Sequence, residues 1–195
     1  GAVKQLGSSG KLTIAAYAVF QKNAIALSGT TYDDIAAGMI RELYINRDQR
    51  QAGVEMEVKS PKLMDLVEPF FSVSVMKSEL RSDGTMVRNK ESPVVIASGG
   101  FMFDKKSIDL NVFCKYVSPF ENVRFAPKTA GPQPLGGFFV VDMNAGYNFE
   151  GRIPLRLYFR IRNLTNKIYS TVVGYPDFGR MFYLGMRLSF TKNPS

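Results

Sequence analysis

The chain has 195 residues, a length that suits one domain, and it carries a formal net charge of +8. It contains no histidine and a single cysteine, Cys114, so the commonest general base and metal ligand is missing and no internal disulfide can form. No apolar run approaches the roughly 18 residues that a membrane-spanning helix needs, which excludes such a helix, and the basic charge comes without a nucleic-acid-binding motif.

Alternation of apolar and polar residues predicts a succession of strands along the chain. The first segment is too short for a full strand, and we interpret it as the end of a strand that starts outside this chain. Eight full strands follow it, which makes nine in all. In chain order the nine segments are Ala2–Gly7, Lys11–Gln21, Gly38–Ser60, Phe70–Leu80, Val94–Phe103, Ser107–Val117, Gly137–Phe149, Arg152–Arg162 and Arg180–Phe190.

The clearest alternation lies in Arg152–Arg162. Its odd positions from Ile153 to Ile161 are all apolar, whereas its even positions carry four arginines, a proline and a tyrosine. This pattern predicts a strand with one apolar face and one wet, cationic face. Strands of about ten residues with this alternation suit a transmembrane barrel, in which closure leaves no backbone group unpaired in lipid. A soluble β-sandwich also has alternating strands and stays open as an alternative at this point.

The lengths of the connections separate these two architectures. They run short, long, medium, long, short, long, short, long, as expected for an up-and-down barrel with short periplasmic turns and longer extracellular loops. A Greek-key sandwich has no reason to alternate in this way. The connections are Ser8–Gly10, Lys22–Ala37, Pro61–Glu68, Arg81–Glu91, Asp104–Lys106, Ser118–Gly136, Glu150-Gly151 and Asn163–Gly179.

Two further patterns give local expectations. Gly99-Gly100 predicts a bulge or a close packing point within its strand. Aromatic residues near strand ends suggest the girdles of a membrane barrel, although aromatic residues favour strands in general. The girdle candidates are Phe70, Phe71, Tyr116, Phe138, Phe139, Tyr147, Phe149, Tyr169 and Phe190.

Four short motifs, in order along nearly the whole chain, resemble landmarks of TonB-dependent outer-membrane receptors. Asn163–Tyr169 (NLTNKIY) is similar to the segment that follows the penultimate strand of that family, and Gly174–Phe182 is similar to its closing Gly-Tyr-Pro and Gly-Arg-x-Phe pattern. Gln51–Glu57 (QAGVEME) is similar to its Gly-Val-Glu strand, and Val140-Val141-Asp142 is similar to its Val-Val-Asp strand start. Each motif is short, and the ordered set is what carries the resemblance.

The resemblance implies an all-β, transmembrane, antiparallel up-and-down β-barrel, of which residues 1–195 would form about nine of 22 strands at the C-terminal end. The plug domain and the N-terminal barrel strands that the family carries are expected to be absent from this chain. The implied partners are a plug-bearing N-terminal receptor segment or chain, TonB acting through that missing segment, outer-membrane lipid and lipopolysaccharide, and a small-molecule nutrient. The implied location is the bacterial outer membrane, and the implied function is active uptake of a scarce nutrient such as a ferric siderophore.

The candidate site residues form two groups, and we expect none of them to be catalytic. Glu55 and Glu57 are two residues apart on one face, but no partner motif supports acid–base chemistry, so we expect neither enzymatic activity nor a metal or cofactor site. The first group is lumen-facing and basic, placed to attract an anionic cargo or, as we favour, to pair with acidic groups of the plug: Arg156, Arg160, Arg162 and Arg187, with Lys115 as an addition. The second group consists of possible ligand contacts on extracellular loops: Tyr32, Arg88, Arg124, Tyr169 and Tyr175.

Two other functions compete with the receptor. A small stand-alone outer-membrane barrel of eight strands, with a structural or adhesive role, would require the N-terminal segment to be frayed. A soluble sandwich or lipocalin-like binding module would require a mostly polar exterior in place of continuous apolar stripes.

Overall fold

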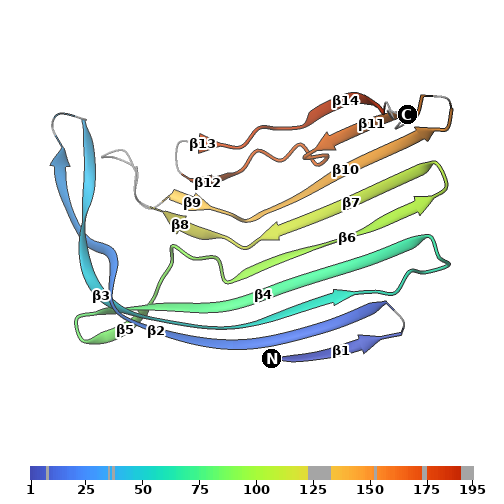
Figure 1. Cartoon of the computed structure of the whole chain (residues 1–195). Coiled ribbons are helices and arrows are strands. Elements are labelled where there is room, and N and C mark those ends of the chain that lie inside the picture. Colours follow the sequence, from blue (N-terminus) through green and yellow to red (C-terminus); the bar gives the residue numbers. More distant parts are fainter. Residues whose placement is uncertain are drawn as a thin grey trace, which may run out of the picture.

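The computed structural model of the chain describes residues 1–7, 9–34, 36, 38–122, 133–151, 153–172 and 175–189. Every regular element in this part of the chain is a β-strand (Figure 1). None of its residues forms a helix long and apolar enough to cross a membrane. The strands are β1 (Ala2–Leu6), β2 (Gly10–Asp34), β3 (Met39–Lys59), β4 (Val67–Ser82), β5 (Thr85–Arg88), β6 (Val95–Lys105), β7 (Ile108–Val117), β8 (Phe120–Asn122), β9 (Gln133–Leu135), β10 (Phe138–Phe149), β11 (Leu155–Arg162), β12 (Ser170–Val172), β13 (Tyr175–Pro176) and β14 (Met181–Leu188).

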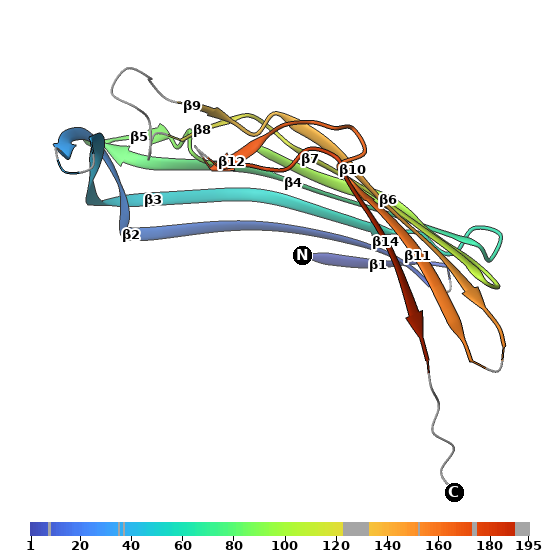
Figure 2. The same ribbon diagram turned by 90° about the horizontal axis from the view of Figure 1, so that it is seen from above.

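One antiparallel sheet holds the long strands in the order β1-β2-β3-β4-β6-β7-β10-β11-β14, and β5 pairs with the end of β4. Neighbours in the sheet are neighbours in the chain once the short strands of the loops are set aside. The sheet is therefore an up-and-down meander, which confirms the predicted fold class and the predicted nine-strand path. Figure 2 shows that the sheet curves along its length. Within the described residues, β1 and β14 are its edges and have no partner strand on their outer sides.

The strand register gives the sheet one polar and one apolar face. Asn111, Asn144, Arg160 and Tyr183 lie side by side across β7, β10, β11 and β14. One residue along each strand, the opposite face presents an apolar row: Phe101, Val112, Met143, Ile161 and Phe182. Because successive side chains point to opposite faces, an unbroken register keeps the two kinds of residue apart across the sheet.

The apolar face is largely uncovered by protein. Leu184 is 81% exposed, Met186 68% and Phe182 61%. The buried core in the described part of the chain is small and consists of Ala24, Val117, Leu135, Phe138, Val140 and Ile161. A continuous exposed apolar surface of this kind is the mark of a surface that meets lipid or a partner rather than water.

One predicted loop, Lys22–Ala37, is wrong, because most of it is the second half of β2 and pairs with β3. The register shifts by one residue between Gln21 and Ala24, where Asn23 has a left-handed backbone with φ of 56°. A bulge of this type inserts an extra residue and reverses which side chains face which way. The alternation therefore breaks at Lys22-Asn23 although the strand continues, which hid its second half from a period-two search.

The other long connections contain short strands that the sequence did not predict. Arg81–Glu91 forms a hairpin in which β5 returns along β4 through Asp83-Gly84, both with positive φ. β8 pairs with β9, and β12 pairs with β13, within the two long connections that follow. The predicted division of sides holds: in Figure 1 the tip of β2–β3, β5, β8–β9 and β12–β13 lie at one end of the sheet and the short turns at the other.

The structure also tests the predictions made for Gly99-Gly100 and for the aromatic residues near strand ends. Of the two alternatives predicted for Gly99-Gly100, the close packing point is confirmed: the register runs through both glycines without a shift, and a Cβ on Gly100 would overlap the carbonyl oxygen of Val112. Phe71, Tyr116, Phe139, Tyr147 and Phe149 lie on the apolar face, as a girdle requires.

Three girdle candidates, Phe70, Phe138 and Tyr169, are wrong because their rings lie on the polar side of the sheet. Phe70 stacks on Phe113 with ring centroids 6.2 Å apart, and both residues have the parity of the polar face. Phe138 is 3% exposed and stacks on Tyr169 at 4.0 Å. Phe190 lies outside the described residues.

Candidate functional site

The four basic residues predicted to face the lumen share the polar face of the sheet. Arg156, Arg160 and Arg162 occupy alternate positions of β11, and Arg187 on β14 lies directly opposite Arg156. Lys115 on β7 belongs to the same face. It pairs with Val140 of β10, which points to the same side of that strand as Asn144, the partner of Arg160. The face is also hollowed further along the sheet, where a cavity of about 270 Å³ is lined by Thr13, Glu55, Glu57, Ser72 and Ser74 among others.

Arg156 is already paired within the chain. Its Nη2 lies 2.8 Å from Oδ1 of Asp109, and the two side chains are 41% and 20% exposed. The pair reaches from β7 to β11 across β10, where the residue between them is Gly146. A Cβ on Gly146 would overlap both the carboxylate and the guanidinium. Glycine at this position therefore makes room for the ion pair, and Arg156 is less available to an outside partner than its neighbours.

Replacing Gly146 with valine should break this arrangement. We expect a loss of about 2 kcal/mol in the free energy of unfolding, because the new side chain displaces a partly buried charged pair. Ala145→Val on the opposite face of the same strand is the matched control and should change the free energy by less than about 0.5 kcal/mol. Denaturant unfolding of the membrane-extracted protein in detergent, followed by circular dichroism, measures both. Equal losses in the two variants would contradict the role given to Gly146.

Arg160 and Arg187 make no ion pair with any residue that the structure describes, and both are exposed. They are the members of the basic group that remain open to an acidic partner. Asp109, which the sequence did not single out, was visible only as a polar position of the Ser107–Val117 alternation.

Arg162 lies in a smaller cavity at the end of the sheet that bears the long connections. This cavity has a volume of about 190 Å³, and it brings two cations together with two carboxylates. Its lining includes Lys115, Asp142, Arg162, Asn163, Tyr169 and Asp177. The charges in it balance, so the structure gives it no net attraction for a small anion.

Asn163 closes one side of this cavity and organises the loop that leads to β14. The residue is 5% exposed, and its backbone φ is 53°. Nδ2 donates to the carbonyl oxygens of Lys167 (2.8 Å) and Phe178 (3.2 Å), and Oδ1 accepts from the backbone N–H of Lys167 and the hydroxyl of Thr165 (both 3.0 Å). The backbone N–H of Asn163 in turn donates to Oδ1 of Asp142 at 2.8 Å. The NLTNKIY motif therefore acts as a hydrogen-bonded turn that fixes this loop against β10.

Tyr169, predicted as a ligand contact, is held by the same loop. Its ring packs on Phe138, and its hydroxyl donates to Oδ2 of Asp177 at 2.6 Å. Burial, together with the hydrogen bond to Asp177, raises the pKa of the Tyr169 hydroxyl to about 12. The hydroxyl therefore stays protonated at any physiological pH and keeps its bond to Asp177.

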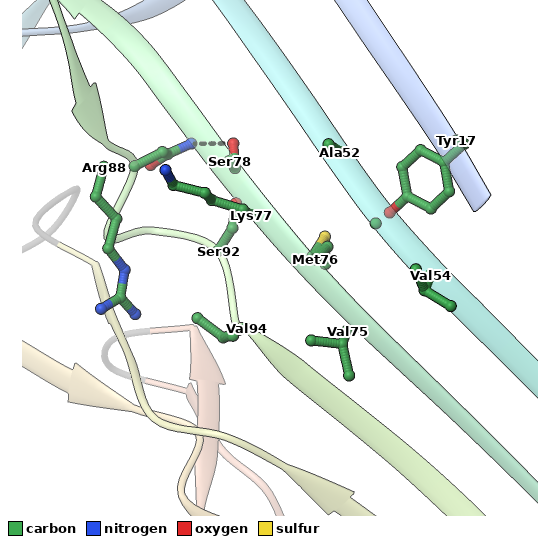
Figure 3. Close-up of a pocket in the computed structure, with 12 residues that line it drawn as sticks. Tyr17, Ala52, Val54, Val75, Met76, Lys77, Ser78, Arg88, Ser92 and Val94 are labelled. Carbon is green, nitrogen blue, oxygen red and sulfur yellow. Dashed lines mark hydrogen bonds between the residues drawn. The ribbon is translucent and has the colours of Figure 1, made fainter.

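The remaining ligand-contact candidates lie on other elements at the same end of the sheet. Tyr32 is in the distal part of β2 opposite Arg41, and its side chain is exposed. Arg88 is in β5 opposite Glu79, at a pocket of about 610 Å³ (Figure 3). Tyr175 lies in β13, and Arg124 lies outside the described residues. Tyr32, Arg88 and Tyr169 therefore come from three separate hairpins.

Comparison with known proteins gives a match in structure alone. No protein-family model matches the chain, and no curated protein does. Among solved structures, the copper transporter OprC matches with a TM-score of 0.66 and 18% identity over 92% of this chain and 29% of that one. The ferric-catecholate import receptor Fiu from E. coli K12 matches with a TM-score of 0.66 and 17% identity over 93% of this chain and 25% of that one. The siderophore receptor PirA from Acinetobacter baumannii matches with a TM-score of 0.60 and 14% identity over 93% of this chain and 30% of that one.

These matches establish the fold. The chain has the fold of part of a TonB-dependent receptor barrel, so the resemblance carried by the short motifs is confirmed at that level. It spans between 25% and 30% of the length of the three structures.

Proposed function

We propose that the chain is the C-terminal part of an outer-membrane β-barrel receptor that takes up a scarce nutrient such as a ferric siderophore. The observation that carries the proposal is the two-faced sheet: an apolar face open to the surroundings over nine strands, backed by a polar face rich in arginine. Bacterial barrels present this combination of an apolar outer wall and a polar lumen to the outer membrane. The matched structures bear the names of transporters and import receptors, which supports a transport role over an enzymatic one.

The rest of the barrel and the plug come from a segment or chain other than residues 1–195. An open sheet cannot stay in lipid, because each unpaired backbone group at its edges costs several kcal/mol there. The edges β1 and β14 therefore pair with further strands in the working receptor. TonB transmits energy through the plug-bearing segment, and the eight-stranded stand-alone barrel loses support, because the described strands do not close on one another.

Within that receptor the basic face has a structural use. Arg160 and Arg187 project from the polar face without an ion-pair partner in the described chain and would pair with acidic groups of the plug. Nutrient contacts would come from the distal part of β2, which holds Tyr32, and from the β12–β13 region. The polar face then fixes the plug, and the outer end of the barrel selects the cargo.

Gentle purification from outer membranes tests this proposal. We expect the chain to leave the membrane only in detergent and to travel as a complex larger than itself. Mass spectrometry should find a plug and the remaining barrel strands either in the same polypeptide as residues 1–195 or in a second component of the complex. A soluble chain without detergent dependence, or a lone heat-resistant particle of one chain's mass, would refute the receptor assignment. Deletion of the chain should also abolish uptake of the cognate nutrient while leaving passive porin permeability unchanged.

A further inference from the structure

A pocket opens on the polar face of the sheet, toward the end that bears the long connections. It has a volume of about 610 Å³ (Figure 3). Tyr17 of β2, Gly53 of β3 and Met76 of β4 lie in one row across it, and Ser78 stands in the next row. Gly53 has the parity of Glu55, and directly paired residues share a face, so the side chains of this row point to the polar side.

One wall of the pocket is the segment that connects β5 with β6. The backbone N–H of Asn89 donates to the carbonyl oxygen of Ser78, and that of Met76 donates to the carbonyl oxygen of Val94, both at 2.8 Å. Between these two bonds β4 has Lys77 alone, whereas the segment has all the residues between Asn89 and Val94. The segment must therefore bow away from β4. It lines the space that this leaves with Asn89, Ser92 and Val94.

Tyr17 gives the pocket an aromatic surface. A Cβ on Gly53 would lie 2.7 Å from the hydroxyl oxygen of Tyr17, so the tyrosine crosses β3 where the glycine leaves room for it. Figure 3 shows the ring reaching from β2 over β3. Tyr17 and Met76 are both partly buried, so part of each side chain stays open to the pocket. The pocket therefore offers a ring and a thioether side by side.

The lining on the polar face carries no charge. None of the lining residues is an aspartate or a glutamate. Lys77 and Arg88 border the pocket, but they pair with Ala52 and Glu79, positions whose side chains point to the apolar face. The polar groups that remain are the hydroxyls of Tyr17, Ser78 and Ser92 and the amide of Asn89. A ligand in this pocket is therefore selected by ring contacts and neutral hydrogen bonds, not by charge.

We propose that this pocket binds an aromatic ring of the nutrient, one that carries a neutral polar group such as a phenol hydroxyl at its edge. Both the ring of Tyr17 and the thioether of Met76 make more favourable contacts with an aromatic partner than with an aliphatic one. The hydroxyls of Tyr17 and Ser92 make no hydrogen bond to any residue that the structure describes, so both are free to pair with the polar group.

Volume and position favour the nutrient over a side chain of the plug. A cavity of about 150 Å³ already holds a benzene ring. A pocket of about 610 Å³ is therefore too roomy for one side chain and has the size of a small-molecule site. The pocket also lies at the level of Ala52 and Val75, beyond which the outward positions of β3 and β4 become charged at Arg50 and Lys77. It thus opens near the outer end of the barrel, where a nutrient enters.

The inference rests on the proposed function, and a matched pair of tyrosine variants tests it. Tyr17→Leu removes the ring from the pocket and keeps an apolar side chain beside Gly53. Tyr158→Leu is the control, because Tyr158 also lies on the polar face and crosses a glycine, Gly185 of the edge strand β14. The receptor complex purified from membranes is titrated in detergent with para-fluorophenol, and with fluorocyclohexanol as the probe without an aromatic ring. Fluorine NMR measures the binding of both.

We expect Tyr17→Leu to weaken para-fluorophenol binding by about 3-fold to 10-fold, the range that one aromatic pair contributes. Ser92→Trp fills the pocket from the connecting segment and should abolish binding, whereas the Tyr158→Leu control should bind within about twofold of the unmodified receptor. Equal weakening in the two tyrosine variants overturns the site, as does fluorocyclohexanol that binds as tightly as para-fluorophenol. Failure of para-fluorophenol to bind the intact receptor also overturns it, because the receptor then fills the pocket from within.

Uptake of the cognate nutrient separates this inference from the proposed function. Uptake should fall in Tyr17→Leu and stay unchanged in Tyr158→Leu. If uptake is the same in both variants and in the unmodified receptor, the aromatic subsite is wrong and the receptor assignment stands. If deletion of the whole chain leaves uptake intact, the proposed function falls and takes this inference with it.

Discussion

Val112→Arg should prevent stable membrane insertion of the sheet or cost it about 2–4 kcal/mol in free energy of unfolding. Val112 lies near the middle of β7 on the apolar face, between Phe101 of β6 and Met143 of β10. At that depth an arginine must desolvate in hydrocarbon or drag water and headgroups inward, and either route is costly. The measurement is the urea-unfolding midpoint of the complex in lipid vesicles, together with its yield in the outer-membrane fraction.

Asn111→Arg is the matched control, because it introduces the same arginine one residue earlier, on the other face. Asn111 pairs with Met102 and Asn144 on the polar face, where an arginine can stay hydrated. We expect this variant to insert normally and to lose less than about 1 kcal/mol. If Asn111→Arg is the more harmful of the two, the assignment of faces is inverted. If the two are equally harmful, neither face meets lipid.

The faces of the sheet were predictable from sequence because period-two alternation has one simple geometric reading. Leu157 and Tyr158 must point to opposite sides of β11 whatever their partners are, so the apolar stripe of Arg152–Arg162 identifies a face before any neighbour is known. The same reasoning fails where the backbone is irregular. The bulge at Asn23 reverses the parity within β2, and the alternation therefore seemed to stop where the strand in fact continues.

Contacts between strands could not be predicted from the sequence, for a different reason. Arg156 and Asp109 are 47 positions apart and meet only because β7, β10 and β11 adopt one particular register around Gly146. Nothing in either local pattern specifies that register. The ion pair between Arg50 and Glu79 shows the same limit: both residues continue the apolar parity of their strands, and their pairing emerges only when β3 lies beside β4.

The basic residues of β11 illustrate how far a prediction of face extends. Arg156, Arg160 and Arg162 share one face of β11, yet the structure gives them three different surroundings: an ion pair, no ion-pair partner among the described residues and a charge-balanced cavity. The alternation within one strand determines to which face a side chain points, whereas its ion pairs and hydrogen bonds depend on residues of two or three strands. The motif at Asn163 adds a third level, since its hydrogen bonds join a turn to residues as distant as Phe178.

Asn163→Ala should therefore have an effect as large as the charged substitution in the wall. The side chain makes four hydrogen bonds in a site where it is almost fully buried, two as donor and two as acceptor. Alanine leaves the carbonyl groups of Lys167 and Phe178 and the N–H of Lys167 without these partners, and it is also strained at a φ of 53°. We expect a loss of about 3–4 kcal/mol, with the cavity beside Arg162 opening and the loop to β14 becoming sensitive to protease.

Two companion variants separate the causes of that loss. Asn163→Gly removes the hydrogen bonds but accepts the left-handed backbone, so it should recover about 1 kcal/mol relative to alanine. Asn166→Ala removes a single bond, from the Arg180 N–H to Oδ1 at 3.0 Å, at a residue with the same φ of 53°, and should cost about 1–2 kcal/mol. Denaturant unfolding and limited proteolysis of the detergent-solubilised complex rank the three. If Asn163→Ala is no worse than Asn166→Ala, the hydrogen bonds of Asn163 do not hold the loop, and the NLTNKIY motif owes its place to the turn geometry alone.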